Sequence, residues 1–211
     1  MGPGADALAE RLRSRGFDAV HVPLIAIESA GDDPIDLSAY DWVVVSSPNG
    51  ARELVRRASG ALPRSAAIGQ ATAEALGGAD VVAAVSTQEG LLAAMPPRPG
   101  QVLFAGAAEA RELLPLALNA DVLVLYHTRP LVPAAPLAGD LVTLASASAA
   151  GALGALGAPS SAIPSVSIGP ETTRAARAAG LNVAAEARSH DLDGLAAAVV
   201  EAAGAIRRAH G

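Results

Sequence analysis

Polar side chains follow apolar runs at four points of this sequence, an arrangement that builds ligand sites in α/β proteins. One apolar run ends in Ser-Ser-Pro-Asn-Gly-Ala at residues 46–51, and another ends in Ala-Ser-Ala-Ser-Ala-Ala at residues 145–150. Two more end in Ile-Gly-Gln-Ala-Thr at 68–72 and Ile-Gly-Pro-Glu-Thr at 168–172. Ligands bind at the carboxyl ends of parallel strands, so hydroxyls, an amide and free helix N–H groups there predict a site for anionic or polar ligands.

Each segment also has a simpler interpretation, because a Ser or Thr just before a helix is often only an N-cap. Ser47, which Pro48 follows, fits that role. Gly69 and Gly169 would let another backbone approach closely, and two threonines further on would present hydroxyls near helix starts. Taken together, four such loops favour an anion-binding cleft over capping alone.

Tyr126 ends an apolar run directly before His127-Thr128-Arg129-Pro130. It is either a structural tyrosine at a strand end or a phenol at a domain junction that donates a hydrogen bond or a proton. The four histidines show no pair at metal-ligand spacing, so we predict no metal site. The sequence has no recognisable Gly-rich phosphate loop.

Composition excludes several classes of function. The 211 residues carry a formal net charge of −6 without a basic stripe, and only 2% are aromatic, so we expect no nucleic-acid partner. The absence of cysteine rules out disulfides and fits a cytoplasmic location. No apolar run approaches the roughly 18 residues of a membrane span, so we expect no membrane association.

Short β-rich runs alternate with Ala-rich helical patterns along the whole chain. Most runs are apolar throughout, as in parallel strands that are covered on both faces. The alternation predicts an α/β fold. The expected strands cover residues 19–24, 42–45, 66–68, 81–85, 102–104, 122–125, 141–144, 165–168 and 182–185.

The chain also repeats itself. Four segments of the first half recur in the same order in the second half, at offsets that drift only as loop lengths would. This predicts a duplication and two similar α/β domains. The segments start at Asp41, Ala67, Gln88 and Asp18, and they recur from Asp140, Ser167, Leu192 and Asp121.

The repeat also predicts an asymmetry between the two domains. The run at 101–106 precedes a helical pattern whose counterpart is residues 5–16, and no counterpart of the run itself precedes those residues. We therefore expect the first domain to lack its N-terminal strand and its sheet to have one strand fewer than the second.

Together, these motifs resemble the uroporphyrinogen-III synthase family over essentially the whole chain. The resemblance rests on Asp-Trp-Val-Val-Val-Ser-Ser-Pro-Asn-Gly-Ala, Tyr-His-Thr-Arg-Pro and both Ile-Gly segments. It implies two flavodoxin-like domains joined by a two-strand linker. The first domain would hold residues 1–24 and 131–211 and the second residues 27–128, with linkers near 23–27 and 126–130.

The implied reaction is the cyclisation of hydroxymethylbilane to uroporphyrinogen III, with loss of water and inversion of the last pyrrole ring. The resemblance assigns the acid to Tyr126, requires no cofactor, and implies a cytoplasmic monomer whose only partner is this linear polycarboxylate tetrapyrrole. Helix N-termini and hydroxyls would bind the carboxylates. The implied substrate-binding residues are Ser46, Ser47, Asn49, Gly69, Thr72, Ser146, Ser148, Gly169 and Thr172.

The chain departs from the family pattern in three places. It lacks the N-terminal strand, has Ala105 where the family tends to carry an arginine, and lacks the usual proline within residues 145–150. Two other functions therefore stay open. One is a non-catalytic tetrapyrrole-binding or regulatory relative, and the other is an unrelated two-lobed small-molecule binding protein.

Overall fold

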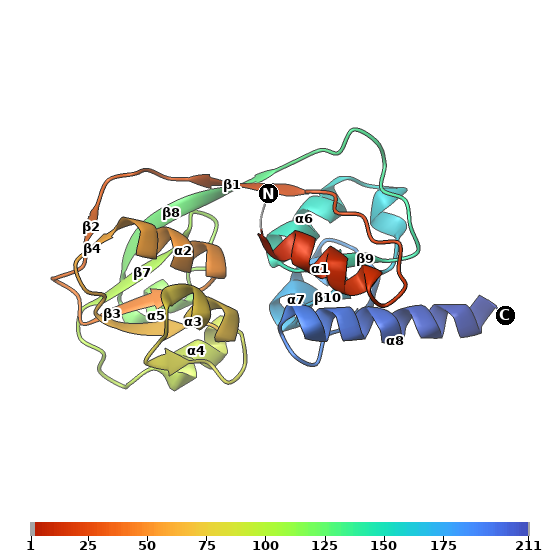
Figure 1. The fold of residues 1–211 in the computed structure, drawn as a ribbon. Helices are drawn as coiled ribbons and strands as arrows, with labels where there is room; N and C mark the ends of the chain where they lie inside the picture. Colours follow the sequence, from red (N-terminus) through yellow and green to blue (C-terminus); the bar gives the residue numbers. More distant parts are fainter. Residues whose placement is uncertain (1–2, 211) are drawn as a thin grey trace. The chain divides into compact units, whose positions relative to one another are not determined.

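The computed structural model describes residues 3–210 and shows a mixed α/β protein with parallel sheets, as the strand and helix patterns predict (Figure 1). The chain divides into two compact units. Unit 1 comprises residues 1–26 and 130–211, and unit 2 comprises residues 27–129. No helix in the described range is both long and apolar enough to cross a membrane.

Unit 2 is built on a six-stranded sheet in the order β1-β8-β7-β3-β5-β6. β7 pairs in parallel with β3 on one side and with β8 on the other. The strands are β1 (Ile25–Ser29), β3 (Trp42–Val45), β5 (Arg64–Ala67), β6 (Val81–Val82), β7 (Val102–Ala107) and β8 (Asp121–Pro130). A separate parallel pair joins β2 (Ile35–Asp36) to β4 (Ala58–Ser59).

The central strand β3 has no polar face, and this forces helices onto both sides of the sheet. Successive side chains of a strand point to opposite faces. Val43 and Val45 accordingly pack in one apolar cluster, while Trp42 and Val44 pack in another. The first cluster is covered by α2 (Pro48–Arg57) and α3 (Gln70–Leu76), and the second by α4 (Gln88–Ala94) and α5 (Leu113–Leu118).

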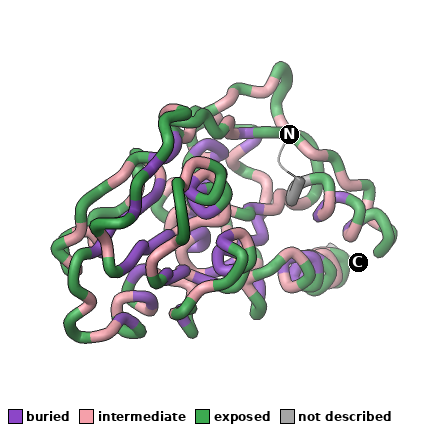
Figure 2. The backbone as a smooth tube through the Cα atoms, turned by 60° about the vertical axis from the view of Figure 1, so that its left-hand side comes forward, coloured by how far each residue is buried: buried purple, intermediate pink, exposed green. Residues whose placement is uncertain are grey.

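Unit 1 repeats this plan on a smaller sheet, with parallel strands in the order β11-β10-β9. Helices again cover both faces. Val166 packs with α1 and α8, whereas Leu144 packs with α6 and α7; Figure 2 marks such buried residues in purple. The elements are α1 (Pro3–Arg13), β9 (Val142–Leu144), α6 (Ala147–Ala155), a short 3-10 helix (Ser160–Ala162), β10 (Ser165–Ser167), α7 (Pro170–Ala178), β11 (Val183–Glu186) and α8 (Leu192–His210).

One strand prediction was wrong, and it changes the size of the smaller sheet. Residues 19–24 form no strand, so the sheet of unit 1 has three strands against six in unit 2, rather than one fewer. The physical reason is that a strand requires a hydrogen-bonded neighbour. Within the described range, no strand lies beside residues 19–24.

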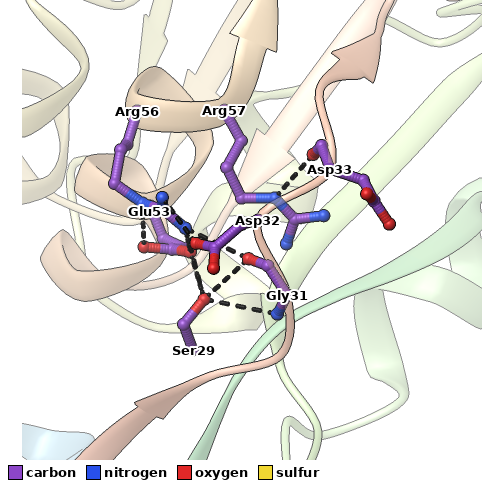
Figure 3. A network of polar contacts seen from close by, with 7 residues as sticks. All are labelled: Ser29, Gly31, Asp32, Asp33, Glu53, Arg56 and Arg57. Carbon is purple, nitrogen blue, oxygen red and sulfur yellow. Dashed lines mark hydrogen bonds and ion pairs between the residues drawn. The ribbon is translucent and has the colours of Figure 1, made fainter.

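In unit 2, residues 29–32, at the end of β1 and just after it, are bonded to α2 through a cluster of charged and polar groups (Figure 3). The Arg56 guanidinium lies 2.6 Å from Glu53 Oε1 and 2.8 Å from Asp32 Oδ1, and it donates to the Gly31 carbonyl at 3.1 Å. Ser29 Oγ donates to Glu53 Oε1 at 2.6 Å. The bonds from Arg56 lower the pKa of Glu53. Residues 29–32 are thereby attached to the last turns of α2.

Two helices at equivalent positions of the repeat begin in the same way. Thr87 Oγ1 accepts the Gly90 N–H at the start of α4, and Asp191 Oδ1 accepts the Gly194 N–H at 2.7 Å at the start of α8. The donors at 90 and 194 occupy equivalent positions of the repeat. Hydrogen bonds, first from Ser189 and then from Gly194, lower the pKa of Asp191.

We predict that D191A destabilises the protein by about 1 kcal/mol, because the first turn of α8 loses its cap. D191N is the matched control, since its amide oxygen keeps an acceptor in place. The extra stability given by the ionised carboxylate is present above its ordinary pKa of 3.8 and is lost as the pH falls through the lower pKa of the folded protein. Urea unfolding at pH 7 and pH 3 measures both effects; equal stability of D191A and wild type at pH 7 would contradict the prediction.

Candidate functional site

The junction between β3 and α2 brings two of the predicted site residues into contact. Ser47 is the N-cap of α2, and its Oγ accepts the Gly50 N–H at 3.0 Å. The same Oγ lies 2.9 Å from the hydroxyl oxygen of Tyr126 in β8. Since the cap leaves the Ser47 hydroxyl hydrogen free to donate, Ser47 can donate to the phenol oxygen or accept from it.

Tyr126 is held in the core by an irregularity in its strand. The register between β7 and β8 shifts between Gly106 and Ala107, so that Ala107 pairs with Tyr126. Leu125 and Tyr126 are consecutive, yet both are buried in the same apolar cluster. A shift of this kind turns a side chain that regular alternation would have placed on the opposite face.

Burial raises the pKa of Tyr126 above its ordinary value of 10.0; the Ser47 hydrogen bond acts in the opposite direction, and the negative charge of Glu109 raises the pKa. Tyr126 is therefore protonated at neutral pH. The phenol can donate a proton, and the neighbouring Ser47 hydroxyl can then donate a hydrogen bond to the phenolate oxygen. A carboxylate next to the phenol was not anticipated from the sequence.

Glu109 reaches this site from the segment that follows β7. Its Oε2 accepts the Thr128 N–H at 3.3 Å, and its Oε1 lies 3.8 Å from His127 Nδ1. The Glu109 and His127 side chains are each about half exposed. No motif marks Glu109, since it belongs to a helix-like pattern, and only the pairing of β7 with β8 places it beside Tyr126.

The remaining predicted site residues of unit 2 differ in their exposure to solvent. Ser46 is partly buried, with its Oγ on the side of Gly106. Asn49 is exposed, and its Oδ1 accepts from Arg52 Nη1 at 3.0 Å. Thr72 is only 2% exposed, so its hydroxyl is not on the surface of the unit.

Unit 1 shows the same pattern. Ser146 caps α6 by accepting the Ala149 N–H at 3.2 Å, and its Oγ lies 3.1 Å from Ser148 Oγ, so the structure brings this pair together. Thr172 is 4% exposed, as deeply buried as its counterpart in unit 2. Ser47 and Ser146 thus both cap a helix. Only Ser47 also contacts the hydroxyl of a tyrosine, Tyr126.

Gly69 and Gly169 are sites of close approach, but their neighbours are side chains. A methyl group on Gly69 would lie 2.7 Å from Ser86 Oγ, and one on Gly169 would lie 3.0 Å from His190 Cδ2. Ser86 and His190 are themselves equivalent in the repeat, at an offset of 104 residues. The repeat could have identified both neighbours.

Unit 1 also contains a buried polar chain that the sequence analysis missed. Ser167 Oγ lies 2.5 Å from Thr173 Oγ1, which in turn donates to Glu186. The equivalent residues of unit 2 are Ala67 and Ala73. Alanine is therefore sufficient for packing at these positions, and the hydroxyls of unit 1 instead anchor the first turn of α7 to the ends of β10 and β11.

We predict that S47A raises the pKa of Tyr126 further, because the bond from Ser47 is what lowers it. The chain has two tyrosines, so absorbance titration of tyrosinate in S47A and wild type, each with Tyr40 replaced by Phe, isolates Tyr126. A lower pKa of Tyr126 in S47A than in the wild type would contradict the prediction.

The raised pKa of Tyr126 also implies a contribution to the free energy of unfolding that is complete below pH 10 and is lost as the pH rises through the pKa of the folded protein.

One family model matches most of the chain. The chain matches the family described as uroporphyrinogen-III synthase HemD over residues 6–197. A mutant uroporphyrinogen III synthase from the extremely thermophilic bacterium Thermus thermophilus superposes with a TM-score of 0.65 at 16% identity, covering 97% of this chain and 96% of that one. The synthetase from Helicobacter pylori 26695 gives 0.58 at 15% identity, covering 85% and 91%. These structural likenesses establish the fold alone, and no curated protein sequence matches the chain.

Proposed function

Because the chain belongs to the uroporphyrinogen-III synthase family, we propose that it cyclises hydroxymethylbilane to uroporphyrinogen III with loss of water and inversion of ring D. We infer the finer fold to be two flavodoxin-like domains that bind the tetrapyrrole, acting as a cytoplasmic monomer without a cofactor. The observation that carries a role for this chain's own residues is the protonated phenol of Tyr126 beside Ser47.

In this proposal Tyr126 donates its proton to the hydroxyl of the substrate's terminal hydroxymethyl group. The C–O bond breaks, water leaves, and a protonated azafulvene remains, whose positive charge balances the phenolate. The phenolate then accepts a hydrogen bond from Ser47, whose position at the N-terminus of α2 favours negative charge nearby. Ring closure, through a spirocyclic intermediate, later releases a proton from carbon, and that proton restores the phenol. The sum of these steps is loss of one water.

The substrate's carboxylates require hydrogen-bond donors, and Arg52 offers one in α2, the helix that Ser47 caps. Its guanidinium is exposed and is held against Asn49 in the first turns of α2. The buried Ala105, where the family tends to carry an arginine, cannot bind an anion with its side chain. We propose that Arg52 binds one carboxylate, together with the N–H groups at the start of α2.

The decisive experiment is incubation of the protein with hydroxymethylbilane, followed by oxidation and separation of type I from type III uroporphyrin. We expect type III product. Y126F should lower kcat by about 100-fold or more, as loss of a general acid does. Y40F is the matched control, because Tyr40 donates to Asp121 at 3.0 Å and has no contact with Ser47. Type I product alone would refute the proposal and leave a non-catalytic tetrapyrrole-binding protein.

R52Q tests the carboxylate contact separately. Loss of one charge-assisted bond should raise KM roughly 5- to 30-fold while kcat changes little. R98Q is the control, since Arg98 is exposed in the loop that precedes β7, at the amino ends of the parallel strands. Equal KM values for R52Q and R98Q would remove Arg52 from the site.

A further inference from the structure

Glu109 is fixed beside Tyr126 by its backbone as well as by its side chain. It lies in the turn that follows β7, and the Ala108 N–H of this turn donates to the Tyr126 carbonyl at 3.0 Å. Two residues further along β8, the Thr128 N–H donates to Glu109 Oε2 at 3.3 Å. Two hydrogen bonds, one from the turn and one to the carboxylate, thus hold Glu109 against the part of β8 that contains the phenol.

Most of the acceptor capacity of this carboxylate is left over. An ionised carboxylate offers about four lone-pair positions. In the part of the chain that the structure describes, the Thr128 N–H is the one hydrogen-bond donor to Glu109, since His127 Nδ1 lies 3.8 Å from Oε1, beyond hydrogen-bond distance. The Glu109 side chain is 55% exposed, so its other acceptor positions are accessible to a ligand.

The chemistry of the proposed substrate narrows what Glu109 can bind. The substrate's own carboxylates carry the same charge as Glu109 and are repelled by it. Its pyrrole N–H groups are hydrogen-bond donors, as the indole N–H of tryptophan is. Its one cationic group arises during the reaction, when water leaves and the protonated azafulvene forms. An acceptor for a pyrrole N–H and a negative charge for this cation are therefore the two favourable roles.

We propose that Glu109 is a second catalytic residue, which accepts the N–H of the pyrrole ring that carries the hydroxymethyl group and stabilises the positive charge that forms on this ring. The inference rests on the proposed function, because it concerns the same substrate and the same step. It gives the two polar neighbours of Tyr126 opposite tasks. Ser47 donates a hydrogen bond to the phenolate, and Glu109 faces the cation that forms with it.

The step balances without a proton transfer to Glu109. The Tyr126 proton leaves with the hydroxyl as water, the electron pair of the C–O bond goes to oxygen, and the positive charge spreads from the exocyclic carbon to the pyrrole nitrogen. A fixed charge that interacts more strongly after the bond breaks than before it lowers the barrier. The charge of Glu109 also acts at the phenol, since burial first and Glu109 second raise the pKa of Tyr126.

E109Q tests the charge while it preserves the local structure, because the amide oxygen of glutamine still accepts the Thr128 N–H. We expect kcat for type III product to fall about tenfold or more, and KM to stay the same or rise, since the stabilised cation exists only after the C–O bond breaks. E112Q is the matched control. It removes the same charge three residues later, at an exposed position at the start of α5, and should behave like wild type.

A titration of Tyr126 supplies a readout that needs no substrate. With Tyr40 replaced by Phe in both proteins, E109Q should lower the pKa of Tyr126, because a negative charge that raises it is gone. An unchanged pKa of Tyr126, or equal kcat values for E109Q and E112Q, overturns the inference.

Two further outcomes have distinct meanings. A lower KM of E109Q at unchanged kcat also overturns the inference, because Glu109 would then only repel the substrate's carboxylates. Failure of the wild type to make any type III product refutes the proposed function itself, and the inference falls with it. Type III product from the wild type, with equal kcat in E109Q, removes the inference and leaves the proposed function in place.

Discussion

The burial of β3 on both faces is the constraint from which the rest of unit 2 follows. Its four side chains leave no polar face, and the apolar clusters above and below require helices on each side. The first polar residues after β3 come where this strand ends and α2 begins. Ser47 lies at this junction, two residues after the last residue of β3, and caps α2.

The Ser47 hydroxyl both caps α2 and contacts the Tyr126 hydroxyl. The helix needs an acceptor for its free N–H groups, and the phenol in the core needs a hydrogen-bonding partner; one hydroxyl meets both needs. The equivalent cap in unit 1, Ser146, has only Ser148 beside it. The two units thus contain similar junctions, and a phenol stands at one of them.

The sequence predicted what depends on local pattern. The uninterrupted apolar run at 42–45 and the Ser47-Pro48 signal predicted β3 and the start of α2, and the repeat predicted the shared plan of the two units. The segment at 19–24 has an equally good strand pattern, but a pattern does not supply a hydrogen-bonding neighbour. Glu109 and the register shift that buries Tyr126 depend on strand pairing between distant residues, which no spacing within one segment records.

The cluster around Arg56 has a mechanical consequence. β1 carries the chain across the boundary between the units, and the residues just after it are fastened to the last turns of α2. The second crossing is β8, which contains Tyr126. The first connector is thereby bonded to the C-terminal part of the helix that Ser47 caps at its start, and the second connector contains Tyr126 itself, the partner of Ser47 in the 2.9 Å contact. A displacement of either connector would therefore act on this contact, through α2 on Ser47 and through β8 on Tyr126.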